Sequence, residues 1–128
     1  MKQTLIESTE ALFDSALATM KKKNADYSGS SESMKNFRLS AEIAHVTMTQ
    51  GILTRLMDKV TRIGNLLIKD RQVHEESILD TVQDLINYTA TLYYGIKTEQ
   101  EEERIKSDPQ LSIFEPQVVD YVTSTTVK

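Results

Sequence analysis

Apolar residues recur at helical spacing along three segments of the chain, and this pattern predicts an all-α fold. The first segment covers residues 4–23, with apolar positions three or four residues apart. The second covers residues 41–69 and begins behind Ser40, a residue type that caps helix N-termini. The third covers residues 74–103, and only residues 70–73 connect it to the second. Because so short a connection favours antiparallel neighbours, we expect an antiparallel bundle of three main helices.

The predicted second helix has a broad apolar arc. One side of it contains Val46, Leu53, Met57, Val60, Ile63 and Leu67. Ile52 and Leu56 widen this arc, as expected for a helix that packs on two sides. Gly51 lies inside the helix, where glycine costs about 1 kcal/mol relative to alanine. The close approach of another helix or of a ligand, or a kink, would account for this glycine.

Turn-forming residues and a tail bound the predicted helices. Residues 24–33 are rich in Asn, Asp, Ser and Gly and predict a loop that continues through residues 34–38. We expect one helical domain over residues 1–106 and a C-terminal tail over residues 107–128, docked on the core or on a neighbouring subunit. The tail is apolar and rich in β-branched residues, which fits a strand, a short helix or an arm that crosses to another subunit.

Composition narrows the classes of function. The 128 residues fit one domain, and the absence of cysteine excludes disulfides, a thiolate nucleophile and cysteine-based metal sites. Because the sequence shows neither a secretory signal nor ~18 consecutive apolar residues, we expect a cytoplasmic protein without a membrane segment. A net charge of −4 argues against binding a DNA or RNA polymer. A small anionic ligand needs only a local group of donors.

The polar side of the predicted third helix carries an acidic stripe. Glu76, Asp80 and Asp84 are four residues apart, so that their like charges repel each other. A cation would relieve this repulsion. Two adjacent carboxylates together with ligand phosphates suffice to bind Mg²⁺, and we expect this ion at Glu76 and Asp80. Two alternatives stay open. Basic side chains of a neighbouring helix would also neutralise the stripe, or the carboxylates simply face solvent near the positive end of the helix.

The polar side of the predicted second helix is basic. Arg55, Lys59 and Arg62 share a broad arc with Asp58. We expect these residues to bind a phosphate-bearing ligand, since arginine and lysine supply charged donors. The competing interpretation is an inter-helix salt network in which the basic residues pair with the acidic stripe and no ligand is bound.

A third candidate lies in the predicted loop. It consists of Lys23, Asp26, Tyr27, Asn36 and Phe37. The polar groups would hydrogen-bond a nucleotide, and the two rings would stack on its base. An ordinary polar surface loop is the alternative. The glycine-rich signatures of the two familiar phosphate-binding loops are absent from the sequence.

Four sequence motifs together resemble a known family. They are K-N-x-D-Y at residues 23–27, N-F at 36–37, R-x-x-D-K-x-x-R at 55–62 and E-S-x-x-D-T-x-x-D-L-x-N-Y at 76–88. As a set they resemble the phage-associated nucleotide modification associated domain proteins of the first type. More distantly, the chain is similar to the all-α nucleoside triphosphate pyrophosphatases of the MazG type. The resemblance covers about residues 20–96.

The resemblance implies a MazG-like helical bundle that assembles as a homo-oligomer and holds Mg²⁺ with acidic residues from two helices. It adds Asn87 and Tyr88 to the expected ligand contacts. The chain departs from MazG-type enzymes on the second helix, where Asp58 stands among basic residues instead of a glutamate-rich motif. Ligand binding therefore fits at least as well as catalysis.

We accordingly expect a phage-type nucleotide-binding protein of the host cytoplasm. It would act on a nucleotide or sequester one, such as a host defence signal, which would give it an anti-defence role. The alternatives are a Mg²⁺-dependent MazG-like pyrophosphatase and a helical protein-interaction module that has no small-molecule ligand.

Overall fold

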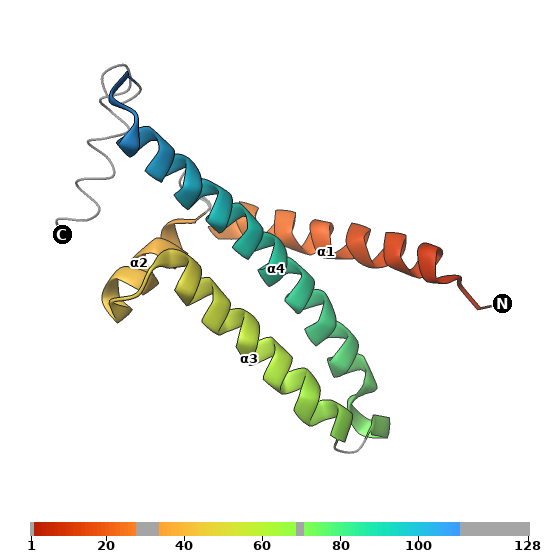
Figure 1. Cartoon of the computed structure of the whole chain (residues 1–128). Helices are drawn as coiled ribbons and strands as arrows, with labels where there is room; N and C mark the ends of the chain where they lie inside the picture. Colours follow the sequence, from red (N-terminus) through yellow and green to blue (C-terminus); the bar gives the residue numbers. More distant parts are fainter. Residues whose placement is uncertain (1, 28–33, 69–70, 111–128) are drawn as a thin grey trace. The chain divides into compact units, whose positions relative to one another are not determined.

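The computed structural model describes residues 2–27, 34–68 and 71–110, with side chains described except within 25–27 and 71–77. All regular structure in these residues is helical, which confirms the predicted all-α fold. The helices are α1 (Leu5–Tyr27), α2 (Lys35–Ala44), α3 (Met48–Ile68) and α4 (Arg71–Ser107) (Figure 1). No helix in this part of the chain is long and apolar enough to cross a membrane.

The chain forms two compact units, Met1–Leu92 and Tyr93–Lys128, and α4 contributes residues to both. The first unit contains α1, α2, α3 and the first part of α4. The expected boundary between residues 106 and 107 stays a prediction, and the expected conformations of the tail lie largely outside the described residues.

A reciprocal capping box starts α1. The backbone N–H of Glu7 donates to the Thr4 hydroxyl at 3.1 Å, and the backbone N–H of Thr4 donates to the Glu7 carboxylate at 2.9 Å. The helix continues to Tyr27, so the prediction that a loop begins at Asn24 was wrong. Residues 24–27 contain neither glycine nor proline, and a helix that is already formed extends through such residues at little cost. The remaining predicted loop, residues 28–33, lies outside the described residues.

Two helices occupy the region in which the sequence predicted a loop followed by one long helix. Residues 35–38 belong to α2, and Ser40 lies inside α2 instead of capping a helix. α2 ends at His45, whose backbone is left-handed with φ of 59°. The backbone N–H of Val46 donates to the Ala41 carbonyl at 3.0 Å, and that of His45 donates to the Glu42 carbonyl at 3.3 Å. These two bonds form a Schellman C-cap.

A second capping box starts α3 directly after this break. The Gln50 N–H donates to the Thr47 hydroxyl at 3.1 Å, and the Thr47 N–H donates to the Gln50 side-chain oxygen at 2.9 Å. The predicted start of this helix at residue 41 was therefore wrong. α4 likewise begins at Arg71, inside the connection predicted for residues 70–73, and it continues beyond the predicted end at Glu103 to Ser107.

α2 and α3 pack around a small apolar core. Its buried members are Met34, Ala41, Met48 and Ile52, with Phe37 and Leu92 packed against them. Gly51 on α3 faces α2 within this helix pair. A methyl group placed on Gly51 would lie 3.8 Å from the Ala41 Cβ and 4.0 Å from the Val46 Cγ2, which are ordinary van der Waals distances. The approach of α2 therefore leaves room for alanine at this position.

Residues 81–88 of α4 are all buried or half-buried. Gln83 contacts α1 twice: its side-chain oxygen accepts from the Ser15 hydroxyl at 2.9 Å, and its amide nitrogen donates to the Thr19 hydroxyl at 3.1 Å. One turn later, the Asn87 side chain donates to the backbone carbonyl of Ala16 at 3.0 Å. The interface between α1 and α4 therefore depends on side-chain amides as well as on apolar contact.

α3 has two neighbouring apolar seams, and only one packs against the chain itself. The inward seam consists of buried and half-buried residues, namely Met48, Ile52, Leu56, Lys59, Ile63 and Leu66. The predicted apolar arc is largely exposed: Val46, Leu53, Met57, Val60 and Leu67 are 39–48% accessible. Of that arc only Ile63 belongs to the inward seam. The reason is that α2 and α4 contact the neighbouring side of α3, which carries Ile52 and Lys59.

The left-handed residue at the end of α2 gives a stability prediction. We expect His45→Gly to raise the free energy of unfolding by about 0.5–1 kcal/mol, because glycine adopts this backbone conformation without the Cβ clash. His45→Val, with a β-branched side chain at the same position, should lower it. Urea denaturation followed by circular dichroism measures both. Destabilisation by glycine would contradict the assigned cap.

Candidate ligand site between the second, third and fourth helices

Lys59 brings a positive charge into the inward seam of α3. Its Nζ lies 3.6 Å from the Asp84 Oδ2 on α4, and the two side chains are 26% and 34% accessible. The same Nζ lies 5.7 Å from the centre of the Tyr88 ring, one turn further along α4. The ammonium is therefore flanked by one carboxylate and one aromatic face, and both come from α4.

Arg55, one turn earlier on α3, also contacts an aromatic ring. Its guanidinium carbon lies 5.7 Å from the centre of the Phe37 ring on α2. Phe37 packs against the apolar core, so its ring is held by that core while Arg55 remains exposed. We name Phe37, Arg55, Lys59, Asp84 and Tyr88 the cation–aromatic cluster.

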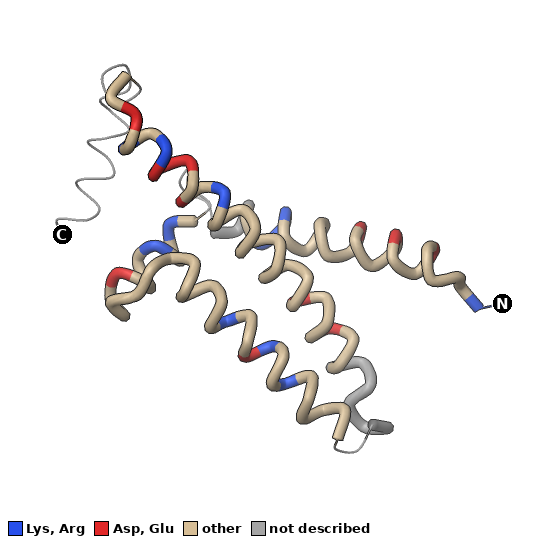
Figure 2. Tube along the Cα trace, in the orientation of Figure 1, with Lys and Arg blue, Asp and Glu red and all other residues tan. Residues whose placement is uncertain are grey.

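The cluster combines three helices of the first unit. Figure 2 shows the basic positions of α3 alongside the acidic positions in the first part of α4. The predicted encounter of these two polar sides is therefore present. It takes the form of the inter-helix ion pair for Lys59 and Asp84, whereas Arg55 lies over Phe37.

The other predicted site residues lie around the cluster or apart from it. Five of them are exposed and lie outside the cluster, namely Lys23, Asn36, Asp58, Arg62 and Asp80. Asn87 donates to the backbone of α1, so its amide already has a structural partner. The side chains of Asp26, Tyr27 and Glu76 lie outside the described residues. A ligand-binding role for all of these residues stays a prediction.

The described carboxylates do not gather into a metal site with three protein ligands. Among the described residues, no group of three His, Asp or Glu side chains is close enough to hold a metal ion. Asp84 faces the Lys59 ammonium, which is the opposite of the arrangement that a cation needs. The side chain of Glu76, one of the two predicted ligands, lies outside the described residues, so Mg²⁺ binding remains an expectation.

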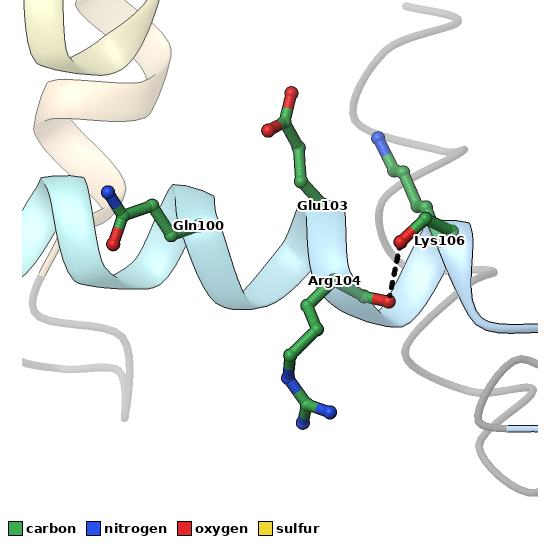
Figure 3. A pocket seen from close by; sticks show the side chains of 5 residues that line it. Gln100, Glu103, Arg104 and Lys106 are labelled. Carbon is green, nitrogen blue, oxygen red and sulfur yellow. Dashed lines mark hydrogen bonds between the residues drawn. The ribbon is translucent and has the colours of Figure 1, made fainter.

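An open depression in the second unit provides a contrast. It is lined by Gln100, Glu103, Arg104, Lys106 and Ser107, and none of these was predicted as a site residue. Figure 3 shows that Glu103 and Arg104 point to different sides of α4, so their charges do not converge. Arg104 instead donates to Glu101 at 3.1 Å, and this hydrogen bond lowers the pKa of that exposed carboxyl. The depression lacks both an aromatic ring and a convergent pair of donors.

Sequence reasoning named the members of the cluster and gave the pairing of basic with acidic side chains as an alternative, but it missed the two cation–aromatic contacts. The signal was present in the spacing: Arg55 and Lys59 are four residues apart on α3, as are Asp84 and Tyr88 on α4. Each pair therefore shares one helix face. The contact between Arg55 and Phe37 was not predictable, because Phe37 was assigned to a loop and not to α2.

The fold and the cluster define a small all-helical protein with paired cations and aromatic rings at a helix junction. No protein-family model, no curated protein and no solved structure matches the chain. Its function is therefore inferred from its residues and their geometry.

A double-mutant cycle tests whether the ion pair is a structural element. We expect Lys59→Met, Asp84→Ala and the double variant to give a coupling energy of about 0.5–1 kcal/mol, because both side chains are partly solvated. Asp84→Ala should cost more than Lys59→Met, since it leaves the ammonium in the seam without its carboxylate. Urea denaturation measures the cycle. A coupling of several kcal/mol would instead identify a structural salt network.

Proposed function

We propose that this chain binds a nucleotide at the cation–aromatic cluster and holds it without hydrolysing it. The observation that carries the proposal is a pair of contacts, each between one cation and one aromatic ring. The two cations lie on adjacent turns of α3, and the rings come from α2 and α4. Cationic donors suit phosphate groups, and aromatic faces suit a base. The cluster offers both kinds of group within one helix junction.

The ion pair within the cluster is compatible with ligand exchange. A charge-assisted hydrogen bond between an ammonium and a carboxylate is typically ~2.8 Å long, and the 3.6 Å contact between Lys59 and Asp84 is longer. An ammonium has three donors, so a phosphate oxygen would approach Lys59 while Asp84 stays close. Arg55, one turn away and exposed, supplies a guanidinium fork for a second phosphate oxygen.

Sequestration is favoured over hydrolysis by the character of the cluster. Phosphoanhydride hydrolysis of the MazG type needs carboxylates that gather a divalent cation, whereas the cluster contains one carboxylate opposite an ammonium. Binding needs only affinity. The resemblance to phage proteins supports a host defence nucleotide as the ligand, and it supports a homo-oligomer as the working form.

A helical interaction module is the second candidate. The exposed apolar side chains along α3 favour this candidate, because they are more numerous than a solvent-facing helix surface normally presents. Such a module would use the charged residues for contacts between its own helices. The two candidates differ in one measurable property, which is stabilisation by nucleotides.

Thermal unfolding with a panel of linear and cyclic nucleotides, with and without Mg²⁺, tests ligand binding. At a ligand concentration about 100-fold above Kd, binding adds about 2.7 kcal/mol to the free energy of unfolding and raises Tm by roughly 10 °C. We expect Arg55→Gln and Lys59→Met to abolish this shift. Lys97→Met is the matched control, because Lys97 lies 5.5 Å from the Tyr93 ring outside the cluster. Absence of any shift with the wild-type chain would favour the interaction module.

Recovery of the ligand after incubation separates sequestration from catalysis. We expect the stabilising nucleotide to be released intact when the complex is heated, because the cluster lacks a group of carboxylates. Chromatography of the released material measures this. Pyrophosphate or a nucleoside monophosphate in the wild-type sample, lost in Asp80→Asn, would instead identify a metal-dependent hydrolase.

A further inference from the structure

A continuous apolar stripe lies exposed on α3, next to the inward seam. It consists of Leu53, Met57, Val60, Gly64 and Leu67, and we name it the α3 stripe. Its four side chains are 39–48% accessible, and Ile68 at its end is 86% accessible. Among the described residues, and apart from the backbone of α3 itself and the two chain neighbours, no atom lies within 4 Å of a methyl group placed on Gly64, so this position is open.

The spacing of the α3 stripe is that of a coiled-coil seam. Its members are alternately four and three residues apart from Leu53 to Leu67, which keeps them on one line along the helix. The exposed residues beside the line are uncharged and include Thr54 and Thr61. The charged residues of α3 lie on the other side, at positions 55, 58, 59 and 62.

We propose that the α3 stripe is the contact surface for a second copy of this chain, with the two α3 helices antiparallel across a two-fold axis. In the register that centres on Met57 and Val60, Leu53 meets the open position at Gly64 of the second copy. Met57 then meets Val60 of the second copy, and the two-fold axis repeats both contacts. A large side chain therefore faces a glycine at each end of the contact, which is the complementarity that knobs-into-holes packing needs.

Area and charge both favour a second copy as the occupant. The four side chains of the α3 stripe together with Ile68 present roughly 500 Å² of accessible surface, so two copies would bury at most about 1,000 Å², where specific interfaces begin. An uncharged flank creates no like-charge repulsion when the stripe meets itself, and it offers no charge with which to select a different partner. The match between the large Leu53 and the small Gly64 arises when the stripe packs against the stripe of a second copy.

This interface specifies how the proposed homo-oligomer assembles and does not depend on the proposed ligand. The cation–aromatic cluster uses Lys59 on the inward seam and Arg55 on the charged side of α3, away from the α3 stripe. A dimer without nucleotide binding would support this inference and contradict the proposed function. A nucleotide-dependent Tm shift in a monomer would do the reverse.

The first test is the mass of the full chain by light scattering. We expect a dimer of twice 14.5 kDa, and we expect Val60→Glu to weaken dimerisation by roughly a hundredfold or more, since it places a carboxylate in an apolar contact. Ile43→Glu is the matched control, because Ile43 is 71% accessible on α2 and lies outside the stripe. A monomeric wild type, or a dimer that survives Val60→Glu, would overturn the proposal.

A mixing experiment tests the register of the two helices. Val60→Glu and Met57→Lys should each dimerise poorly. Mixed in equal amounts, they should form a heterodimer, because the introduced carboxylate of one copy then meets the introduced ammonium of the other. The symmetry-related contact in this heterodimer stays Met57 against Val60. Failure of the mixture to dimerise would overturn the antiparallel register.

Discussion

A single lysine in an otherwise apolar seam sets the relation between α3 and α4. Lys59 stands where the neighbouring positions of the inward seam are Leu56 and Ile63. A cation at such a position must keep a partner, because desolvating an unpaired ammonium is costly. Asp84 and Tyr88 supply that partner from two adjacent turns of α4, at the place where α3 and α4 meet.

The residues on either side of this contact hold it in place. Gln83 and Asn87 attach the same turns of α4 to α1, so α4 is packed from two directions over residues 81–88. The short α2, stopped by the left-handed His45, positions Phe37 beneath Arg55. The polar cluster is thus a consequence of how three helices of the first unit pack.

The circumference of α3 is divided into surfaces with different roles. The inward seam packs within the chain and includes Lys59, the charged side carries Arg55, and the α3 stripe is exposed. A helix that is apolar over so wide an arc is expected to pack on two sides, and within the described chain only one side is packed. With this division, one short sequence segment can serve both the proposed ligand binding and the proposed assembly.

Periodicity predicted the helical class and the long helices, because burial of one face leaves a repeat that can be read from the sequence. It missed α2, since Ser40 resembles a cap and the true capping box at Thr47 and Gln50 follows the break. It also grouped the two apolar seams of α3 into one broad arc. Two neighbouring apolar seams look alike in sequence, and only the positions of α2 and α4 decide which is buried.

Residue types identified the members of the cluster for a related reason. Charge and aromatic character are local properties, so Arg55, Lys59 and Asp84 stood out in the sequence. Their partners depend on long-range packing, which brings Phe37 to one cation and Tyr88 to the other. The use of Asn87 as a contact to α1 could not be predicted, because an amide serves a backbone carbonyl and a ligand equally well.

Amide chemical shifts of the ¹⁵N-labelled chain, recorded during titration with a nucleoside triphosphate, locate the ligand most directly. Binding at the cation–aromatic cluster predicts that the largest changes fall on residues 37, 55–62 and 84–88, and that Lys59→Met removes them. Changes centred on the depression at residues 100–107, or unchanged spectra at saturating nucleotide, would contradict binding at this cluster.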